Sequence, residues 1–220
     1  QAIGFEVRDF GNLEVPVRDE LDPGHANARY LPEILAACTR LSNVVYRILE
    51  NARLPLVLGG DHSIAIGSIS GASRYYQEQG KRIGLIWIDA HADMNTPDTT
   101  PSGNIHGMPL ASVIGLGPED LTQLGGPPAP KVNPKNVAIV GLRSVDAKER
   151  YNVRKSGVTS FTMRDIDERG MRSVMDEAIR IAGNGTEGIH VSLDLDAVDP
   201  SEAPGVGTPV KGGLSYREAH

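Results

Sequence analysis

Short apolar runs alternate with helix-like segments along the chain, and this order restricts the fold more than any other feature. The runs occupy residues 3–7, 54–58, 83–88, 137–140, 158–161 and 189–193. Between them, apolar residues recur at three- and four-residue steps, most clearly over 31–52 and 174–181, as on one face of a helix. The pattern therefore predicts an α/β fold with three αβα layers around a central, mostly parallel sheet.

Length and composition favour one soluble globular domain over residues 1–220. Acidic residues (28) outnumber Lys and Arg (22), which gives a net charge of −6 and argues against a nucleic-acid partner. Apolar runs are all too short to span a membrane, so we expect no membrane partner. The single cysteine, Cys38, falls in a helical pattern as a core residue and has no internal disulfide partner, which favours a reducing, cytoplasmic setting.

The strand-like run 83–88 leads directly into Asp89, His91 and Asp93. In extended backbone, residues two apart point to the same face, so both carboxylates and the imidazole would lie together. Burying these polar groups is costly unless a cation or a dense hydrogen-bond network compensates. The spacing indicates a divalent metal site, and the alternative is a strand-end turn that carries solvated acids.

Two further turns carry similar residues. His62 follows the run 54–58, and Asp194 and Asp196 follow the run 189–193. The same alternation predicts that both aspartates point one way while Leu195 packs inward. Because open α/β sheets form their sites beyond the carboxyl ends of the strands, all three turns are expected to converge.

Together these turns supply more ligands than one tetrahedral ion needs, and they fit two metals about 3.5–4 Å apart. The set is rich in oxygen and contains no thiolate, which favours Mn²⁺ over zinc. Asp61 is interpreted as a helix cap or as a hydrogen-bonding partner beside His62. The candidate ligands are His62, Asp89, His91, Asp93, Asp194 and Asp196.

Three ordered motifs in the chain resemble those of the ureohydrolases: Gly-Gly-Asp-His-Ser at 59–63, Asp-Ala-His-Ala-Asp at 89–93, and Ser-Leu-Asp-Leu-Asp-Ala-Val-Asp-Pro at 192–200. The resemblance implies an arginase/deacetylase-like fold, two Mn²⁺ per subunit, a homotrimer or homohexamer, and hydrolysis of a guanidino compound to urea and an amine. It also implies two ligand sets with Asp89 and Asp194 bridging. The first set is His62, Asp89, Asp93 and Asp194, and the second is His91, Asp89, Asp194 and Asp196.

The loop after Asp93 is similar to the arginase branch of this family, which implies L-arginine as the small-molecule substrate and L-ornithine and urea as products. Neutral donors would bind the α-carboxylate, acids would bind the α-ammonium group, and Thr208 matches a position that lines the family's site. The implied donors are Asn95, Thr100, Ser102 and Asn104, and the implied acids are Asp146 and Glu149. The alternative for the loop is a Gly/Ser turn without a substrate contact.

The expected reaction is attack of a metal-bridging hydroxide on the guanidinium carbon. Asp93 would pass on the proton of the hydroxide, and His106 would act as acid or proton shuttle for the departing amine. His106 also has a structural alternative, as a loop residue bonded to a backbone carbonyl. Other open alternatives are an agmatinase or another guanidino-acid ureohydrolase, and a non-catalytic metal-binding paralogue.

We expect the chain to be a bacterial-type fragment that lacks both ends of the fold. It starts at Gln1 without a methionine and stops at His220, shortly after a sequence typical of a first helical turn. The resemblance implies a guanidinium-pairing glutamate beyond His220, so these residues are expected to form an incomplete site.

Overall fold

The computed structural model describes residues 4–126 and 130–220. Its centre is a four-stranded sheet in the order β3-β2-β1-β4, and every neighbouring pair is parallel. The strands are β1 (Ile83–Ile88), β2 (Val137–Leu142), β3 (Thr159–Thr162) and β4 (Gly188–Leu193). The parallel α/β prediction is confirmed.

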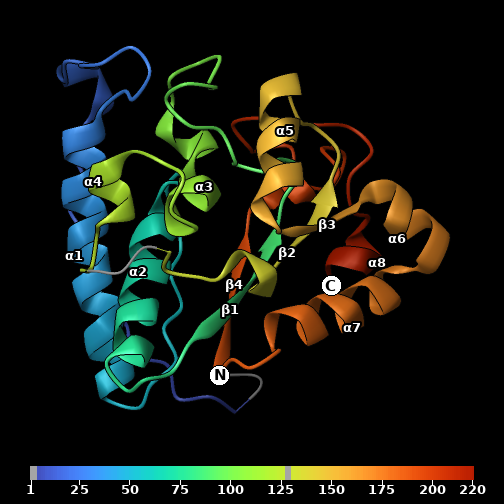
Figure 1. Cartoon of the computed structure of the whole chain (residues 1–220), viewed down its shortest axis with the longest axis horizontal. Coiled ribbons are helices and arrows are strands. Elements are labelled where there is room, and N and C mark those ends of the chain that lie inside the picture. Colours follow the sequence, from blue (N-terminus) through green and yellow to red (C-terminus); the bar gives the residue numbers. More distant parts are fainter. Residues whose placement is uncertain (1–3, 127–129) are drawn as a thin grey trace.

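Helices cover both faces of the sheet (Figure 1). Apolar side chains of one sheet face form a core with α1 (Leu31–Glu50), α2 (Ile64–Gln77), α3 (Pro109–Val113) and α5 (Ala147–Ser156). The opposite face packs on α6 (Met163–Arg169) and α7 (Met171–Ala182). The remaining short helices are α4 (Glu119–Thr122) and α8 (Tyr216–Ala219). None of the helices in the described ranges has the length and apolar character that crossing a bilayer requires.

Strands β1 and β2 form because their apolar side chains are buried on both faces, as in parallel sheets covered by helices. Each strand therefore reads as a continuous apolar run, and their carboxyl ends lie at the same edge of the sheet. That edge is where the polar turns after the strands gather.

Two glycines allow α2 to lie very close to α1. A Cβ on Gly67 would lie 2.7 Å from the Cys38 carbonyl oxygen, and one on Gly71 would overlap the Ser42 carbonyl oxygen. Cys38 is buried in this contact, as expected, and its thiol donates to the carbonyl oxygen of Ser63 at 3.3 Å. The packing thus fixes the start of α2, which follows directly on the His62 segment.

The strand expected at 54–58 is wrong. This segment has no regular structure, and Leu54, Leu56 and Leu58 are 93%, 80% and 83% exposed. A short apolar run favours a buried strand, but a strand also needs a neighbour to hydrogen-bond with, and 54–58 pairs with no strand of the described sheet.

Other boundaries agree with the sequence pattern, with three exceptions. Residues 4–7 are irregular, and Ile3, the first residue of the strand expected there, lies outside the described residues. The segment 115–135 is rich in Gly and Pro, as exposed loops are, yet its Leu121 and Val132 are buried. The short helix α6 was not expected, although Thr162 and Asp165 form a capping box at its start.

Candidate metal centre

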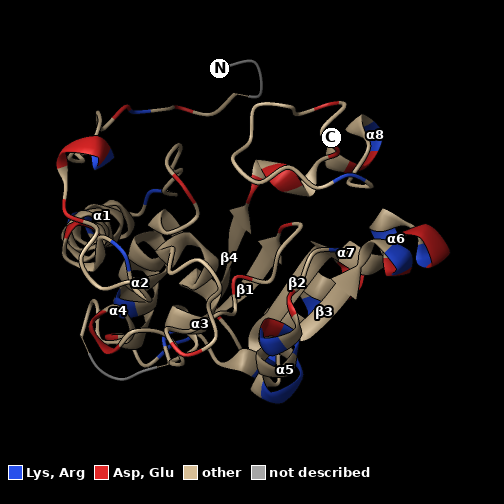
Figure 2. Ribbon diagram, turned by 90° about the horizontal axis from the view of Figure 1, so that it is seen from above, with Lys and Arg blue, Asp and Glu red and all other residues tan. Residues whose placement is uncertain are grey.

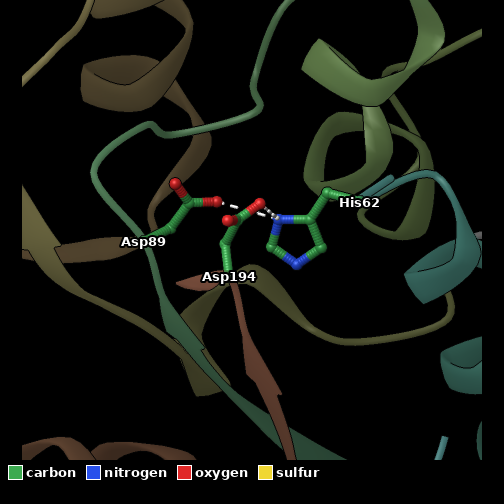
Figure 3. A group of neighbouring side chains, drawn as sticks. All are labelled: His62, Asp89 and Asp194. Atoms are coloured by element: carbon green, nitrogen blue, oxygen red, sulfur yellow. Dashed lines mark hydrogen bonds and ion pairs between the residues drawn. The ribbon is translucent and has the colours of Figure 1, made fainter. Parts of the chain in front are cut away.

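Three segments that are distant in sequence converge beyond the carboxyl ends of β1 and β4. Asp89 follows β1 directly, Asp194 follows β4 directly, and His62 precedes α2. The Nδ1 atom of His62 lies 2.9 Å from Asp89 Oδ2 and 3.3 Å from Asp194 Oδ2 (Figure 3). The Oδ2 atom of Asp93 lies 3.1 Å from the same nitrogen. One imidazole therefore faces three carboxylates.

A second group lies beside the first and shares Asp89 with it. His91 Nδ1 is 3.4 Å from Asp89 Oδ1 and 3.0 Å from Asp196 Oδ2. In each of the two groups, Asp89–His62–Asp194 and Asp89–His91–Asp196, one ligand atom per residue lies within 4.8 Å of the others. The predicted convergence of the three turns is confirmed.

The local backbone differs from the extended geometry that led to this prediction. Asp93 has φ of +50°, in the left-handed region, and Asp196 belongs to a 3₁₀ turn, η4 (Leu195–Ala197). Leu195 is 59% exposed, so its expected inward packing is wrong. The carboxylates converge because the turns fold back on the strand ends, and simple alternation does not describe them.

Two residues that the sequence analysis missed hold His62 in position. Ser192 Oγ lies 2.8 Å from His62 Nε2, which directs Nδ1 toward the carboxylates. Trp87 stacks on the imidazole with ring centroids 3.9 Å apart, and its indole N–H donates to Asp89 Oδ2 at 3.0 Å. Each lies two residues before an aspartate ligand, so strand alternation was a signal for both.

The Asp196 turn is held by groups from two other segments. The hydroxyl of Thr208 donates to Asp196 Oδ2 at 2.9 Å. The guanidinium of Arg143, which follows β2, donates to the backbone carbonyls of Asp196 and Ala197. Thr208 was predicted to line the site, whereas Arg143 was not predicted to have a role.

The electrostatics of the cluster show what a cation would replace. Burial lowers the pKa of His62, but hydrogen bonds with Asp194, Asp89 and Asp93 outweigh it and raise the pKa to about 11. Asp196 and Asp89 raise the pKa of His91 to about 10. Burial and the charge of Asp89 raise the pKa of Asp93 to about 7. In the absence of a metal ion, bound protons therefore offset part of the negative charge of the carboxylates.

The donor set fits two divalent cations. The four carboxylates offset the four positive charges of two such ions. Each carboxylate also lies within 3.3 Å of an imidazole nitrogen, so one cation can bind both groups once the nitrogen has lost its proton. A site of carboxylate oxygens and two imidazole nitrogens suits Mn²⁺, whereas thiolate ligands would favour zinc.

The candidate substrate residues fall into two places. Asn95 is buried, its side-chain NH₂ donates to Asp146 Oδ2 at 3.0 Å, and its oxygen accepts from the Thr99 hydroxyl at 2.9 Å. Thr100, Ser102 and Asn104 take part in hydrogen bonds within the loop. The Thr100 hydroxyl accepts the backbone N–H of Gly103, and the Ser102 hydroxyl accepts the backbone N–H of Asn104. This loop is tied to the metal segment, because Asn95 N–H donates to the Gly107 carbonyl at 3.1 Å.

Asp146 and Glu149 both belong to the start of α5 but differ in exposure. Asp146 caps the helix by accepting the N–H groups of Lys148 and Glu149, and it is partly exposed. Glu149 is only 5% exposed and accepts the backbone N–H of Met94 at 3.0 Å. Burial raises the pKa of Glu149, and the charge of Asp146 adds to this rise.

His106 lies near the centre on the turn η2 (Ile105–Gly107), and its side chain is 38% exposed. Its Nδ1 atom is 3.7 Å from Asp61 Oδ2, and this carboxylate raises the pKa of His106. The other oxygen of Asp61 accepts the N–H of Ser63 at 3.0 Å. Asp61 therefore holds the turn ahead of α2 and also faces the imidazole of His106.

The parallel sheet and the two overlapping ligand groups define an α/β protein with a candidate binuclear metal centre. Known proteins agree with this description. A family model described as "Arginase family" matches residues 2–220. An arginase of Brevibacillus brevis is 49% identical over 220 residues, which cover 100% of this chain and 72% of that protein. The chain belongs to the arginase family.

A solved structure, arginase from Bacillus caldovelox, matches with a TM-score of 0.93 at 45% sequence identity. The match covers 100% of this chain and 72% of that one. An arginase of Bacillus subtilis is 46% identical over 218 residues. The resemblance stated from the three motifs is therefore confirmed, and its bacterial character agrees with these relatives.

Proposed function

We propose that the protein hydrolyses L-arginine to L-ornithine and urea at a binuclear manganese centre. The observation that carries the proposal is the pair of ligand groups that share Asp89 at the carboxyl edge of the sheet. Membership of the arginase family and the names of the relatives support the choice of reaction.

Two Mn²⁺ would be held by the sets expected from the motifs: His62, Asp89, Asp93 and Asp194 for one, and His91, Asp89, Asp194 and Asp196 for the other. When bound, such ions lower the pKa of a shared water and stabilise the negative charge that develops on the substrate. The residues beside them fix the geometry, since Ser192, Trp87 and Thr208 hold individual ligands.

Asp93 and His106 supply the proton transfers. The Asp93 carboxylate is buried at the centre, 3.1 Å from His62 Nδ1, where it can accept the proton of the water and pass it on. The carboxylate of Asp61 favours the protonated imidazole of His106, which can then protonate the departing amine of ornithine.

The two ends of the substrate's amino-acid group would bind at the loop after Asp93 and at α5. Asn95, Thr100, Ser102 and Asn104 are neutral donors for the α-carboxylate. Asp146, with Glu149 behind it, supplies negative charge for the α-ammonium group. Agmatine lacks the α-carboxylate, so these donors favour arginine over agmatine.

The remaining proposals concern partners and setting. We propose a small-molecule substrate and no nucleic-acid partner, because Lys and Arg are spread over several helices and interspersed with acids (Figure 2). We propose a homotrimer or homohexamer on the basis of the family resemblance. We propose a cytoplasmic location because the single cysteine, Cys38, is a free thiol in the structure.

The test is urea release from L-arginine and from agmatine by the full-length protein with Mn²⁺. The proposal predicts a much larger kcat/KM for arginine. A preference for agmatine would favour the agmatinase alternative. Two bound Mn²⁺ without urea from any guanidine would favour the non-catalytic paralogue.

A further inference from the structure

Helix α5 holds the peptide that follows Asp93 from both sides. The N–H of Met94 donates to Glu149 Oε1 at 3.0 Å. The carbonyl of Met94 accepts from Asn152 Nδ2 at 2.8 Å. One residue later, the side chain of Asn95 donates to Asp146 Oδ2. Asp146, Glu149 and Asn152 follow one another at three-residue steps, so they share one side of the helix.

Asp93, which precedes the held residue Met94, has a backbone conformation that needs support. Asp93 has φ of +50°, a left-handed conformation that costs a non-glycine residue about 1–2 kcal/mol. Its own carbonyl accepts the N–H of Ala111 in α3 at 3.2 Å. Both peptide groups of Met94 are also bonded, so the backbone on the C-terminal side of Asp93 is fixed. This conformation brings the Asp93 carboxylate to 3.1 Å from His62 Nδ1.

We propose that Glu149 and Asn152 are positioning residues for the metal centre: they clamp Met94 and thereby hold Asp93 in its left-handed conformation. This inference rests on the proposed function only in taking Asp93 as a manganese ligand. It gives Glu149 a role besides any contribution to binding the α-ammonium group. It also gives a role to Asn152, whose side chain lies three residues further along α5.

Burial and contact geometry support the hydrogen-bonding role of Glu149. The residue is buried, and the bond to Met94 N–H is its direct contact with the Asp93 turn. A glutamine keeps an oxygen for this bond but removes the charge. The two roles therefore separate: the clamp needs an acceptor at this position, whereas attraction of an ammonium group needs the negative charge.

The experiment compares Glu149→Gln, Glu149→Ala and Asn152→Asp in the full-length protein. Asn152→Asp keeps the size of the side chain but replaces the donor by an acceptor that faces a carbonyl. Arg150→Ala, on the exposed side of α5, is the matched control. Mn²⁺ affinity is measured by equilibrium dialysis, together with thermal unfolding of the metal-free protein and the KM for arginine.

The clamp predicts that Glu149→Ala and Asn152→Asp weaken Mn²⁺ binding by about 10–100-fold, as loss of groups that orient ligands does. Glu149→Gln and Arg150→Ala should bind Mn²⁺ within about twofold of the unchanged protein, a difference of about 0.4 kcal/mol.

Equal loss of Mn²⁺ affinity in Glu149→Gln and Glu149→Ala would overturn the clamp, because charge would then be the property that matters. Lower thermal stability with unchanged Mn²⁺ affinity in Glu149→Ala and Asn152→Asp would overturn it too. If Glu149→Ala fails to fold, Asn152→Asp and Glu149→Gln still decide. Absence of urea production would refute the proposed function but would leave the metal-binding comparison intact.

Discussion

Loading the centre with two Mn²⁺ should release at least two protons per chain at pH 8, because each of the two histidine ligands must be neutral. In the metal-free protein the pKa of His62 is raised to about 11 and that of His91 to about 10. Both imidazoles are therefore protonated at pH 8, and both must lose the proton when they bind a cation.

The number of protons released should depend on pH in a defined way. Burial and the charge of Asp89 raise the pKa of Asp93, so this carboxyl takes up a proton more readily than an ordinary aspartate as the pH falls. The number of protons released should therefore increase as the pH is lowered from 8. Since the cations compete with at least the two histidine protons, the overall loading constant should rise at least about 100-fold per pH unit near pH 8.

Isothermal titration calorimetry of Mn²⁺ binding, in two buffers with different ionisation enthalpies, counts these protons from the slope of the observed enthalpy. His25→Asn, in the N-terminal loop, is the control and should leave the slope unchanged. Release of less than about one proton at pH 8 would refute the assignment of both histidines as ligands.

Three substitutions test other parts of the account. Ser192→Ala removes the hydroxyl at His62 Nε2 and should weaken Mn²⁺ binding about tenfold in equilibrium dialysis. Ser173→Ala, at an exposed position, is the control. Equal Mn²⁺ affinities of the two variants would contradict the orienting role of Ser192. Gly71→Ala forces a methyl group into a carbonyl of α1 and should lower the free energy of unfolding by about 1–3 kcal/mol in urea denaturation, whereas a gain in stability would contradict the close packing. His106→Asn should reduce kcat for urea release by about 10²–10⁴-fold at unchanged Mn²⁺ content, and full urea production would remove its proton-transfer role.

The sequence was most informative where one physical requirement was enough. The run Ile83–Ile88 is apolar throughout because both faces of β1 are covered, so its strand could be predicted without its neighbours. The convergence of the acidic turns followed from the shared edge of a parallel sheet. The helix α1 was predicted from its apolar stripe alone.

The failures occurred where the outcome depends on another segment. Leu54–Leu58 is a short apolar run typical of a buried strand, but pairing decides whether extended backbone joins a sheet. The left-handed Asp93 depends on bonds from α3 and α5, so local spacing could not reveal it. The exposure of Leu195 follows from the turn η4, which alternation does not anticipate.

The most direct test of the binuclear centre is the number of Mn²⁺ bound per chain, measured by elemental analysis after equilibrium dialysis. Because both ligand groups contain Asp89, the account predicts about two Mn²⁺ per chain and the loss of both in Asp89→Ala. Binding of about one Mn²⁺ or fewer per chain by the unchanged protein, or unchanged metal content in Asp89→Ala, would contradict it.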